Sequence, residues 1–386
     1  MREMNMGSLL RALRVLGPRA RVELAEYTGI SPATVTKLVA NLTEAEILVE
    51  RADTHSLRLT GRPRVPVDFN PHRRAVLALH LGPDSITAAA LDLRGTVLVE
   101  RSADYPDGSA ARSVQAGARL LARVVKALPD QCVAVGVGVT SAGRVDREHG
   151  AVRGRRDRGW DDVLVSAPIA DHLGLPVELD QPVRGEALAA LATDEQAQHL
   201  IHLSVGEEIS AALLIDRHVH RGHTGEAGGV AHLPVPGARG PECGCGQTGC
   251  LGAVATDVAL VEAARAKKVI GGEDGYAELV AAADDRSRPA VALLRTRARA
   301  IGQALAVLAD LVDPDRLLVG GSALAWGGFQ PEVEQTFVEL SGRRADLLRF
   351  GPGRVEPVVA AGMLFLDRYF DDPVRHEPEL QRRLNA

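Results

Sequence analysis

The stretch RVELAEYTGISPATVTKLVANLTEAEILVE, residues 21–50, decides the architecture of the N-terminal part of this chain. We expect a short helix over about Val22–Tyr27, a tight turn at Thr28-Gly29-Ile30, and a second helix with Ser31 as its N-cap and Pro32 at its first position. A Gly in the turn and a short, polar-capped second helix are typical of a helix-turn-helix, whose second helix enters the DNA major groove. The alternative is an ordinary helical hairpin.

The flanking residues complete a winged helix-turn-helix. SLLRALRVL, residues 8–16, has apolar positions at helical spacing and ends before a Gly-Pro pair. The segments Ile47–Arg51 and Leu57–Leu59 look like the strands of a wing, and GRPRVP at 61–66 looks like its exit. The sequence therefore predicts a DNA-binding domain over residues 1–70, with double-stranded DNA as its partner.

The first turns of the second helix supply the expected base-reading residues. Their Thr side chains can contact thymine methyls or phosphates, and their Lys can reach a phosphate or a guanine. These residues are Ser31, Pro32, Ala33, Thr34, Thr36 and Lys37. Val35, Leu38 and Leu42 lie on the opposite face and should be core. Arg62 and Arg64 flank a proline in an extended segment that suits a minor groove or a phosphate row, the alternative being two solvated surface arginines.

Length and charge fit such a module on a larger body. At 386 residues the chain should hold two or three domains, and 46% hydrophobic residues suffice for large cores. The net charge of −5 hides an asymmetry, since residues 1–70 hold ten Lys and Arg against eight Asp and Glu. No apolar run approaches a membrane span and the N-terminus lacks a signal-peptide core, so we expect a cytoplasmic protein without a membrane partner.

A different pattern begins after Phe69-Asn70-Pro71, and it predicts an α/β fold for residues 71–386. Two or three hairpin-linked strands are expected within residues 75–103, then a helical stretch at 109–128 and a buried strand in QCVAVGVGVTSAG (131–143). Further helices are expected near 164–173 and 185–192, and further strands at 176–180, 199–205, 209–216 and in RLLVGGSAL (316–324). The sequence shows no internal repeat.

Three of the four cysteines fall within eight residues, in GGVAHLPVPGARGPECGCGQTGC (228–250). His232, Cys243, Cys245 and Cys250 form a closed set of four ligands for tetrahedral structural zinc, and the intervening glycines let the backbone fold tightly around the ion. The alternative is three free thiols beside an unrelated His. We therefore expect an inserted zinc-binding loop at about 223–252 that organises structure and does no chemistry.

At this point the whole chain resembles a transcription regulator of the ROK family, which comprises repressors, open reading frames and sugar kinases. The motifs that carry the resemblance are His232 with CGCGQTGC (243–250), GRPRVPVDFN (61–70), SAGRVD (141–146) and RGWDDV (158–163). The resemblance implies a two-lobed, actin-like (ribonuclease H-like) α/β domain with a cleft between the lobes. It also implies structural zinc near the sugar pocket and a homo-oligomer, a dimer or a tetramer, which suits two DNA half-sites.

The groups that family kinases use to move phosphate are altered. The Asp-x-Gly turn after the first strand reads His80-Leu81-Gly82, and the Asn-Asp pair that carries the catalytic base reads Gln181-Pro182. Asp180 is two residues upstream, but nothing in the sequence shows that it substitutes. The second phosphate turn reads Gly206-Glu207-Glu208-Ile209-Ser210, where two acidic side chains would repel a nucleotide. Since loss of one base costs about two to four orders of magnitude in rate, we expect no enzyme activity.

The family's sugar pocket is altered as well. Of the sugar-binding set implied by the resemblance, His232 survives and Asp157 replaces an Asn, while Gly229 and Gly252 stand where carboxylates are usual. The candidate ligand-binding residues are therefore Asp157, Asp180, Gln181 and His232. The two aspartates have an alternative interpretation as solvated carboxylates. Sugar acids would meet Glu207, Glu208 and Asp157 unless Arg184 or Arg156 compensates for the negative charge.

The sequence thus predicts a DNA-binding transcription regulator, a repressor more than an activator, whose kinase-like domain senses a sugar-related small molecule. One alternative is a regulator that needs no ligand and whose second domain serves oligomerisation. The other is an active sugar kinase with a DNA-binding head, which the altered turns argue against.

Overall fold

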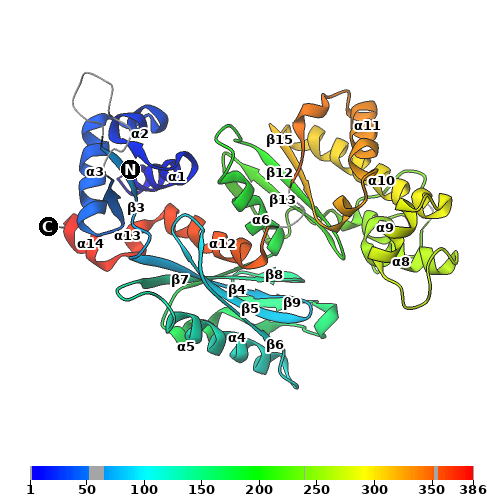
Figure 1. Ribbon diagram of the computed structural model, residues 1–386, viewed down its shortest axis with the longest axis horizontal. Coiled ribbons are helices and arrows are strands. Elements are labelled where there is room, and N and C mark those ends of the chain that lie inside the picture. The colour runs from blue at the N-terminus through cyan, green and yellow to red at the C-terminus, as the bar shows by residue number, and fades with distance from the viewer. Residues whose placement is uncertain (1, 52–64, 239, 352–354, 386) are drawn as a thin grey trace. The chain divides into compact units, whose positions relative to one another are not determined.

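The computed structural model describes residues 2–51, 65–238, 240–351 and 355–385, and these group into two compact units (Figure 1). Unit 1 comprises Met1–Glu195 together with Glu356–Ala386, and unit 2 comprises Gln196–Val355. The helix-turn-helix and the first half of the α/β region thus share unit 1. The expected domain boundary near residue 70 stays a prediction, because the compact units divide the chain along a different line.

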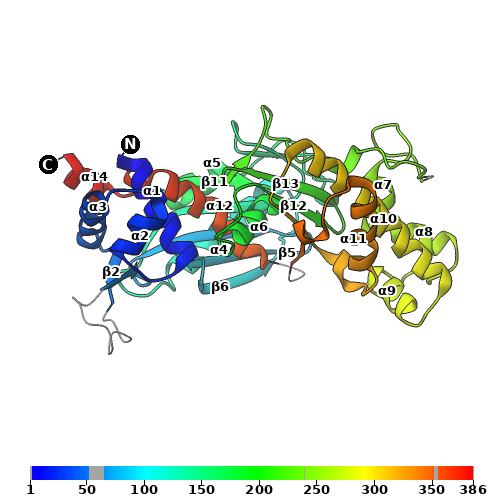
Figure 2. The same cartoon turned by 90° about the horizontal axis from the view of Figure 1, so that it is seen from above.

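The N-terminal part of unit 1 is the expected winged helix-turn-helix (Figure 2). Its elements are α1 (Arg2–Leu16), β1 (Arg19–Ala20), α2 (Arg21–Thr28), α3 (Pro32–Glu44), β2 (Leu48–Glu50) and β3 (Pro66–Phe69). The three strands form an antiparallel sheet in the order β1-β3-β2, and Glu50 pairs with Val67. The first helix begins at Arg2, six residues before the expected start, while the expected strand Leu57–Leu59 lies outside the described residues.

Local sequence explains the turn before α3. Gly29 has a φ of +69°, a left-handed conformation that costs a glycine little, and it ends α2. The Ser31 hydroxyl accepts a hydrogen bond from the Thr34 amide at 3.3 Å, and Pro32 occupies the first turn of α3, as predicted. Val35, Leu38 and Leu42 are buried, which confirms the expected core face of α3.

The remainder of unit 1 is a five-stranded mixed sheet in the order β11-β7-β4-β5-β6. Three strands form an antiparallel meander, and the other two run parallel to its first strand. The strands are β4 (Arg74–Leu81), β5 (Ser85–Asp92), β6 (Val97–Asp104), β7 (Val133–Ser141) and β11 (Val177–Asp180). A small sheet follows β7, with strands β8 (Arg144–Asp146), β9 (Ala151–Arg153) and β10 (Val163–Leu164), which the sequence did not predict.

Helices cover both faces of this sheet (Figure 1). The pair α4 (Ala110–Val125) and α5 (Ser166–Leu173) packs on one face, and the pair α6 (Pro182–Leu191) and α12 (Pro357–Asp371) packs on the other. Glycines let α12 lie directly on its neighbours: a Cβ on Gly138 of β7 would lie 1.9 Å from the Ala361 carbonyl oxygen, and one on Gly185 of α6 would lie 2.0 Å from that of Ala360. The chain then ends with α13 (Pro373–His376) and α14 (Pro378–Asn385).

Unit 2 repeats the same sheet topology, although the sequence shows no repeat. Its sheet has the order β16-β15-β12-β13-β14, again a meander with two strands parallel to its first strand. The strands are β12 (Leu200–Val205), β13 (Ile209–Ile215), β14 (His218–His220), β15 (Arg316–Gly320) and β16 (Leu348–Phe350). Its helices are α7 (Leu251–Ala255), α8 (Asp257–Ala266), α9 (Tyr276–Asp284), α10 (Arg288–Val312) and α11 (Phe329–Ser341).

The expected α/β architecture is therefore confirmed, with small shifts at element ends. The helix expected from residue 185 begins at Pro182, and the strand expected before the Gly-Gly turn within residues 316–324 spans Arg316–Gly320. Within the described ranges, no helix combines the length and the apolar character that crossing a membrane requires.

Candidate functional site

The candidate DNA-reading surface is the start of α3. Ser31, Pro32, Ala33, Thr36 and Lys37 are exposed, and Thr34 is half-buried. The Thr36 hydroxyl donates to the Pro32 carbonyl at 2.8 Å, which leaves its methyl group and the Lys37 ammonium as the outward groups of this turn. The helix therefore offers small, partly apolar groups and one cation to a groove, while Arg62 and Arg64 lie outside the described residues.

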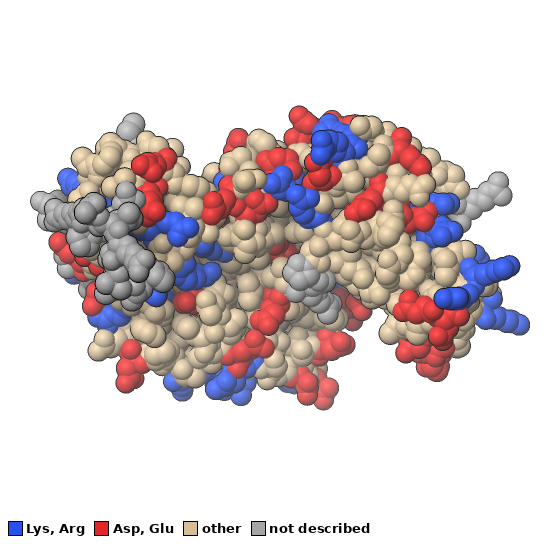
Figure 3. Space-filling model, turned by 45° about the horizontal axis from the view of Figure 1, so that its top comes forward, with Lys and Arg blue, Asp and Glu red and all other residues tan. Residues whose placement is uncertain are grey.

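Charge alone does not mark this surface. Lys37 is the only cationic residue within α3 (Pro32–Glu44). On the face visible in Figure 3, basic and acidic side chains are interspersed. The assignment of α3 as the reading helix therefore depends on its shape, capping and exposure.

The four expected metal ligands come together in unit 2. His232 belongs to the 3₁₀ turn η2 (Val230–His232), and the cysteines lie on a loop that two β-bridges close, Pro234 with Cys250 and Glu242 with Thr248. The ligand atoms all lie within 4.8 Å of one another. The Cys243 Sγ to His232 Nδ1 distance is 3.4 Å, and the Cys245 Sγ to Cys250 Sγ distance is 3.6 Å.

The separations of 3.4 Å and 3.6 Å are close to the edges of a tetrahedron around zinc. Zn–S bonds of about 2.3 Å and Zn–N bonds of about 2.0 Å imply ligand separations of roughly 3.5–3.8 Å. Gly246 and Gly249 have φ values of +84° and +78°, so the turns between the cysteines use a backbone conformation that glycine adopts readily. Three thiols and an imidazole without an open position fit a structural ion.

The thiols differ in their surroundings. Burial raises the pKa of the Cys250 thiol to about 11. The backbone amide of Gln247 lowers the pKa of the Cys245 thiol from its usual value. Because a metal binds the thiolate, an ion entering this cluster must displace a proton from Cys250 at neutral pH.

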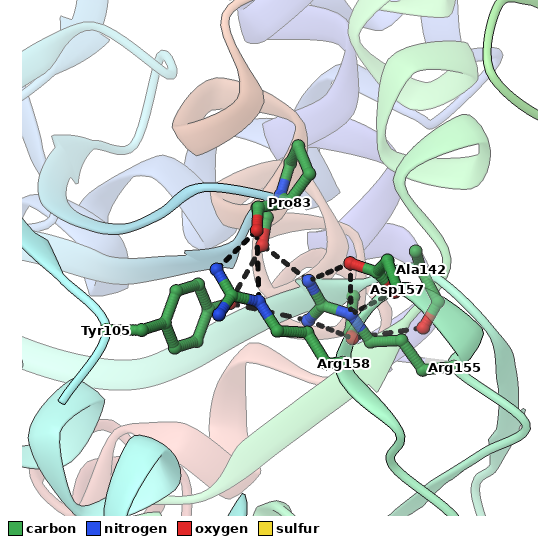
Figure 4. Close-up of polar contacts among 8 residues, drawn as sticks. Pro83, Tyr105, Ala142, Arg155, Asp157 and Arg158 are labelled. Carbon is green, nitrogen blue, oxygen red and sulfur yellow. Dashed lines mark hydrogen bonds and ion pairs between the residues drawn. The ribbon is translucent and has the colours of Figure 1, made fainter. Parts of the chain in front are cut away.

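In unit 1, the His80-Leu81-Gly82 segment, which the sequence led us to compare with a phosphate turn, lies at the β4–β5 hairpin, and an arginine covers it (Figure 4). Arg155 is fully buried, and its guanidinium donates to the Gly82 carbonyl, to the Ser141 hydroxyl at 3.3 Å and to the Asp157 carboxylate at 3.0 Å. The Gly82 amide donates to the Ser85 carbonyl at 3.0 Å. The polar backbone groups of Gly82 are thus engaged within the protein.

A second arginine lies beside the first. The Arg158 guanidinium stacks 3.7 Å from the centre of the Tyr105 ring, and its Nε donates to the Pro83 carbonyl at 3.0 Å. Pro83 itself has no N–H to offer a phosphate. His80 stands at the position where the resemblance implies an Asp in family kinases. Its Nδ1 lies 2.9 Å from the Thr140 hydroxyl. Sequence reasoning missed this arginine cover, because Arg155 and Arg158 bond to carbonyls that lie 73 and 75 positions away in the sequence.

Asp180, the carboxylate nearest to the expected base position, and its neighbour Gln181 also form polar contacts within the protein. Asp180 is fully buried at the end of β11 and forms an ion pair with the equally buried Arg184 one helical turn later. The Gln181 side-chain amide donates to the Gly143 carbonyl at 3.0 Å. Because Arg184 is buried in its ion pair with Asp180, it is not placed to neutralise a bound acid. The side chain of Arg156 lies outside the described part of the structure.

The remaining candidates are distributed over both units. Asp157 lies in η1 (Arg156–Arg158), and its carboxylate is 41% exposed and paired with Arg155. His232 belongs to the metal cluster of unit 2. The segment 206–210, which the sequence led us to compare with a second phosphate turn, is also in unit 2. Its Gly206 amide donates to the Glu208 carbonyl at 3.0 Å, and the side chains of Glu207 and Glu208 are exposed.

Comparison with known proteins agrees with this architecture. The ROK family profile matches residues 76–345. A transcriptional regulator of Mycobacterium bovis is 32% identical over 386 residues, covering 95% of this chain and 86% of its own. The xylose repressor of Bacillus subtilis is 21% identical, covering 96% and 97%. The DNA-binding transcriptional repressor Mlc of Escherichia coli is 22% identical, covering 83% and 81%.

Solved structures give the same result. A ROK family transcriptional regulator, a homologue of the Escherichia coli MLC protein, superposes with a TM-score of 0.81 at 23% identity, covering 96% of this chain and 97% of its own. A ROK hexokinase from Thermus thermophilus superposes with a TM-score of 0.67 at 26% identity, covering 76% of this chain and 99% of its own. The similarity to the regulator spans nearly the whole chain, whereas the similarity to the hexokinase leaves about a quarter of it unmatched.

Proposed function

The chain belongs to the ROK family, as one of its transcriptional regulators, and we propose that it is a repressor that binds operator DNA through α3. The observation that carries this proposal is the exposed, Ser31-capped start of α3, in a chain whose full-length relatives are regulators. Two copies in a dimer or a tetramer would read two half-sites about one helical turn of DNA apart.

Selection from a random duplex library tests this proposal. The purified protein should enrich a pseudo-palindromic sequence, and its affinity for that duplex should exceed its affinity for a scrambled duplex by about a thousandfold or more at physiological salt. Sedimentation of the complex should give an even number of protomers per duplex. Equal binding to selected and scrambled duplexes would contradict the proposal.

We further propose that residues 71–386 transfer no phosphate. Three features support this: the Gly82 amide already donates to the Ser85 carbonyl, Pro182 stands at the position of the base, and Asp180 is buried against Arg184. A carboxylate held by an ion pair inside the core cannot reach a sugar hydroxyl. ATP with a panel of hexoses and N-acetylated hexosamines should yield no sugar phosphate above the enzyme-free background.

The metal cluster serves as a structural zinc site in this proposal. Its closed set of four ligands would fix the loop at about 223–252 and, with it, the packing of η2 against β13 in unit 2. Metal analysis of the purified protein should give one zinc per chain.

Whether this regulator senses a ligand is a separate question. The contacts of the candidate residues restrict which of them a ligand could reach. We propose a sugar-related effector, but the buried Asp180 and the committed Gln181 leave Asp157 as the exposed candidate in unit 1. The burial of Asp180 and the hydrogen bond of Gln181 also favour the second candidate function, a regulator that needs no ligand. Thermal-shift screening separates the two, because a ligand at one hundred times its Kd stabilises the protein by roughly 2.7 kcal/mol. A mobility-shift titration then shows whether the ligand changes DNA affinity.

A further inference from the structure

We propose that Glu377, near the C-terminus, is a positioning residue for the DNA-reading helix α3. The proposal rests on the proposed function, since it assumes that α3 reads DNA. Its starting point is a buried contact between three segments of unit 1 that lie far apart in the sequence: the end of α3, the start of β4 and the junction between α13 and α14.

Arg74 is the centre of this contact. Its Nε donates to Glu377 Oε1 at 2.7 Å and its Nη2 to Glu377 Oε2 at 2.8 Å, a two-pronged pairing of guanidinium and carboxylate. The same Nη2 donates to the carbonyl of Ala45, the residue that caps the C-terminus of α3, at 3.3 Å. The side chains of Arg74 and Glu377 are 11% and 4% exposed. Glu377 therefore fixes the guanidinium that holds the end of α3.

The surroundings of Glu377 hold it in place. The Tyr369 hydroxyl, fully buried in α12, donates to Glu377 Oε1 at 3.0 Å. Burial, together with the Glu377 carboxylate, raises the pKa of Tyr369 well above its ordinary value, so the phenol stays a donor. Leu380 of α14 is buried, and α14 lies beside α3 in both views of the ribbon (Figure 1, Figure 2).

The contact connects α3 to the five-stranded sheet of unit 1. Arg74 is the first residue of β4, the central strand of the five-stranded sheet. A second link runs in parallel, because Arg73 pairs with Glu46, immediately after the helix cap. The stacked rings of Phe69 and Phe370, with centres 5.9 Å apart, join the wing strand β3 to α12. α3 is thus held against the sheet, and its direction follows that of the sheet.

This arrangement has a consequence for DNA binding. Base readout needs α3 at a fixed angle in the groove, whereas phosphate contacts tolerate a shift of the helix. Loosening the Arg74–Glu377 pair should therefore weaken binding to the selected duplex and leave binding to a scrambled duplex nearly unchanged. A residue that only stabilises the fold would alter neither affinity in a protein that remains folded.

The test compares three variants of the full chain. Glu377→Gln removes the charge and keeps the shape, and Tyr369→Phe removes one donor to Glu377 as a milder change. Glu178→Gln is the matched control, because Glu178 is a buried carboxylate paired with Arg368 of α12 at 3.1 Å, and its pairing does not involve α3. Fluorescence anisotropy measures the Kd for the library-selected duplex and for the scrambled duplex at one salt concentration. Hydrogen exchange of the α3 amides is measured without DNA.

We expect Glu377→Gln to bind the selected duplex about tenfold more weakly, a loss of about 1.4 kcal/mol, and the scrambled duplex within twofold of wild type. The α3 amides should exchange faster, Tyr369→Phe should show the same effects at smaller size, and Glu178→Gln should bind both duplexes as wild type does. Unchanged selected-duplex affinity in Glu377→Gln and Tyr369→Phe overturns this inference alone. Wild-type protein that selects no duplex overturns the proposed function, and the inference with it.

Discussion

Lys37 is the one cation of α3, so its contribution to DNA binding can be isolated. Its side chain is exposed on the same face as Ala33 and Thr36. We expect Lys37→Ala to weaken binding about three- to tenfold and, if Lys37 contacts a phosphate, to reduce the slope of log K against log salt by about one. Lys126→Ala, at the exposed end of α4, is the control. Equal affinities for Lys37→Ala and wild type at every salt concentration would remove Lys37 from the interface.

Asp180 offers a second test at the scale of one residue. Replacing it by Asn leaves the Arg184 guanidinium buried without its counter-charge, so we expect the free energy of unfolding to fall by about 3–5 kcal/mol. Urea denaturation measures this change. Asp162→Asn is the control, because that carboxylate is 67% exposed in its pair with Arg153 and its loss should change stability little. A similarly small loss of stability in both variants would mean that the Asp180–Arg184 ion pair contributes little to the free energy of unfolding.

Among the elements, the α6–α12 contact depends on one glycine. Gly185→Ala would place a methyl group 2.0 Å from a backbone carbonyl oxygen that cannot move without shifting α12. We expect a loss of about 2–3 kcal/mol or more, despite the better helix propensity of Ala. Gly117→Ala in α4 is the comparison, since its methyl group would meet only the flexible tip of Leu79, at 2.9 Å. Thermal unfolding should rank Gly185→Ala far below Gly117→Ala.

The cysteine loop carries the next prediction. Because burial raises the pKa of Cys250 to about 11, zinc must displace its proton, and zinc affinity should fall as pH falls, by about tenfold per pH unit for each proton released. Competition with a chromophoric chelator between about pH 6 and pH 8 measures this dependence. Cys245→Ser should lose stoichiometric zinc and lower the unfolding temperature. Retention of both in that variant would show that Cys245 is not a ligand.

The sequence predicted those elements whose signals are local. The Ser31 cap, the turn glycine and the cysteine spacing act within a few residues, so the helix-turn-helix and the grouping of the metal ligands followed from them. The arginine cover of the first turn did not follow, because Arg155 and Gly82 meet only after the small β8–β10 sheet brings them together. Nor could spacing reveal the Arg74–Glu377 pair, whose partners lie 303 residues apart.

At the scale of the whole molecule, two sheets of identical strand order occur in one chain without a matching sequence repeat. Each meander needs only alternating apolar residues and turns, and these conditions allow the sequences to differ widely. The division into units could not be predicted either. A change of pattern near residue 70 suggested a separable head, whereas packing between α1 and α12 places that head in unit 1.

Unit 1 is assembled from two segments that unit 2 separates in the sequence, since residues 356–386 complete what residues 1–195 begin. During translation, unit 1, which contains the helix-turn-helix, therefore cannot be complete until residues 356–386 have been synthesised, after all of unit 2. Premature stop codons before residue 356 leave a fragment that lacks α12 and the Glu377 contact. We expect such fragments, expressed beside the intact protein, to be cleared instead of occupying operators, so truncation alleles should behave as recessive losses of regulation. A dominant truncation that still occupies the operator, seen by footprinting, would show that the head folds without its C-terminal partner.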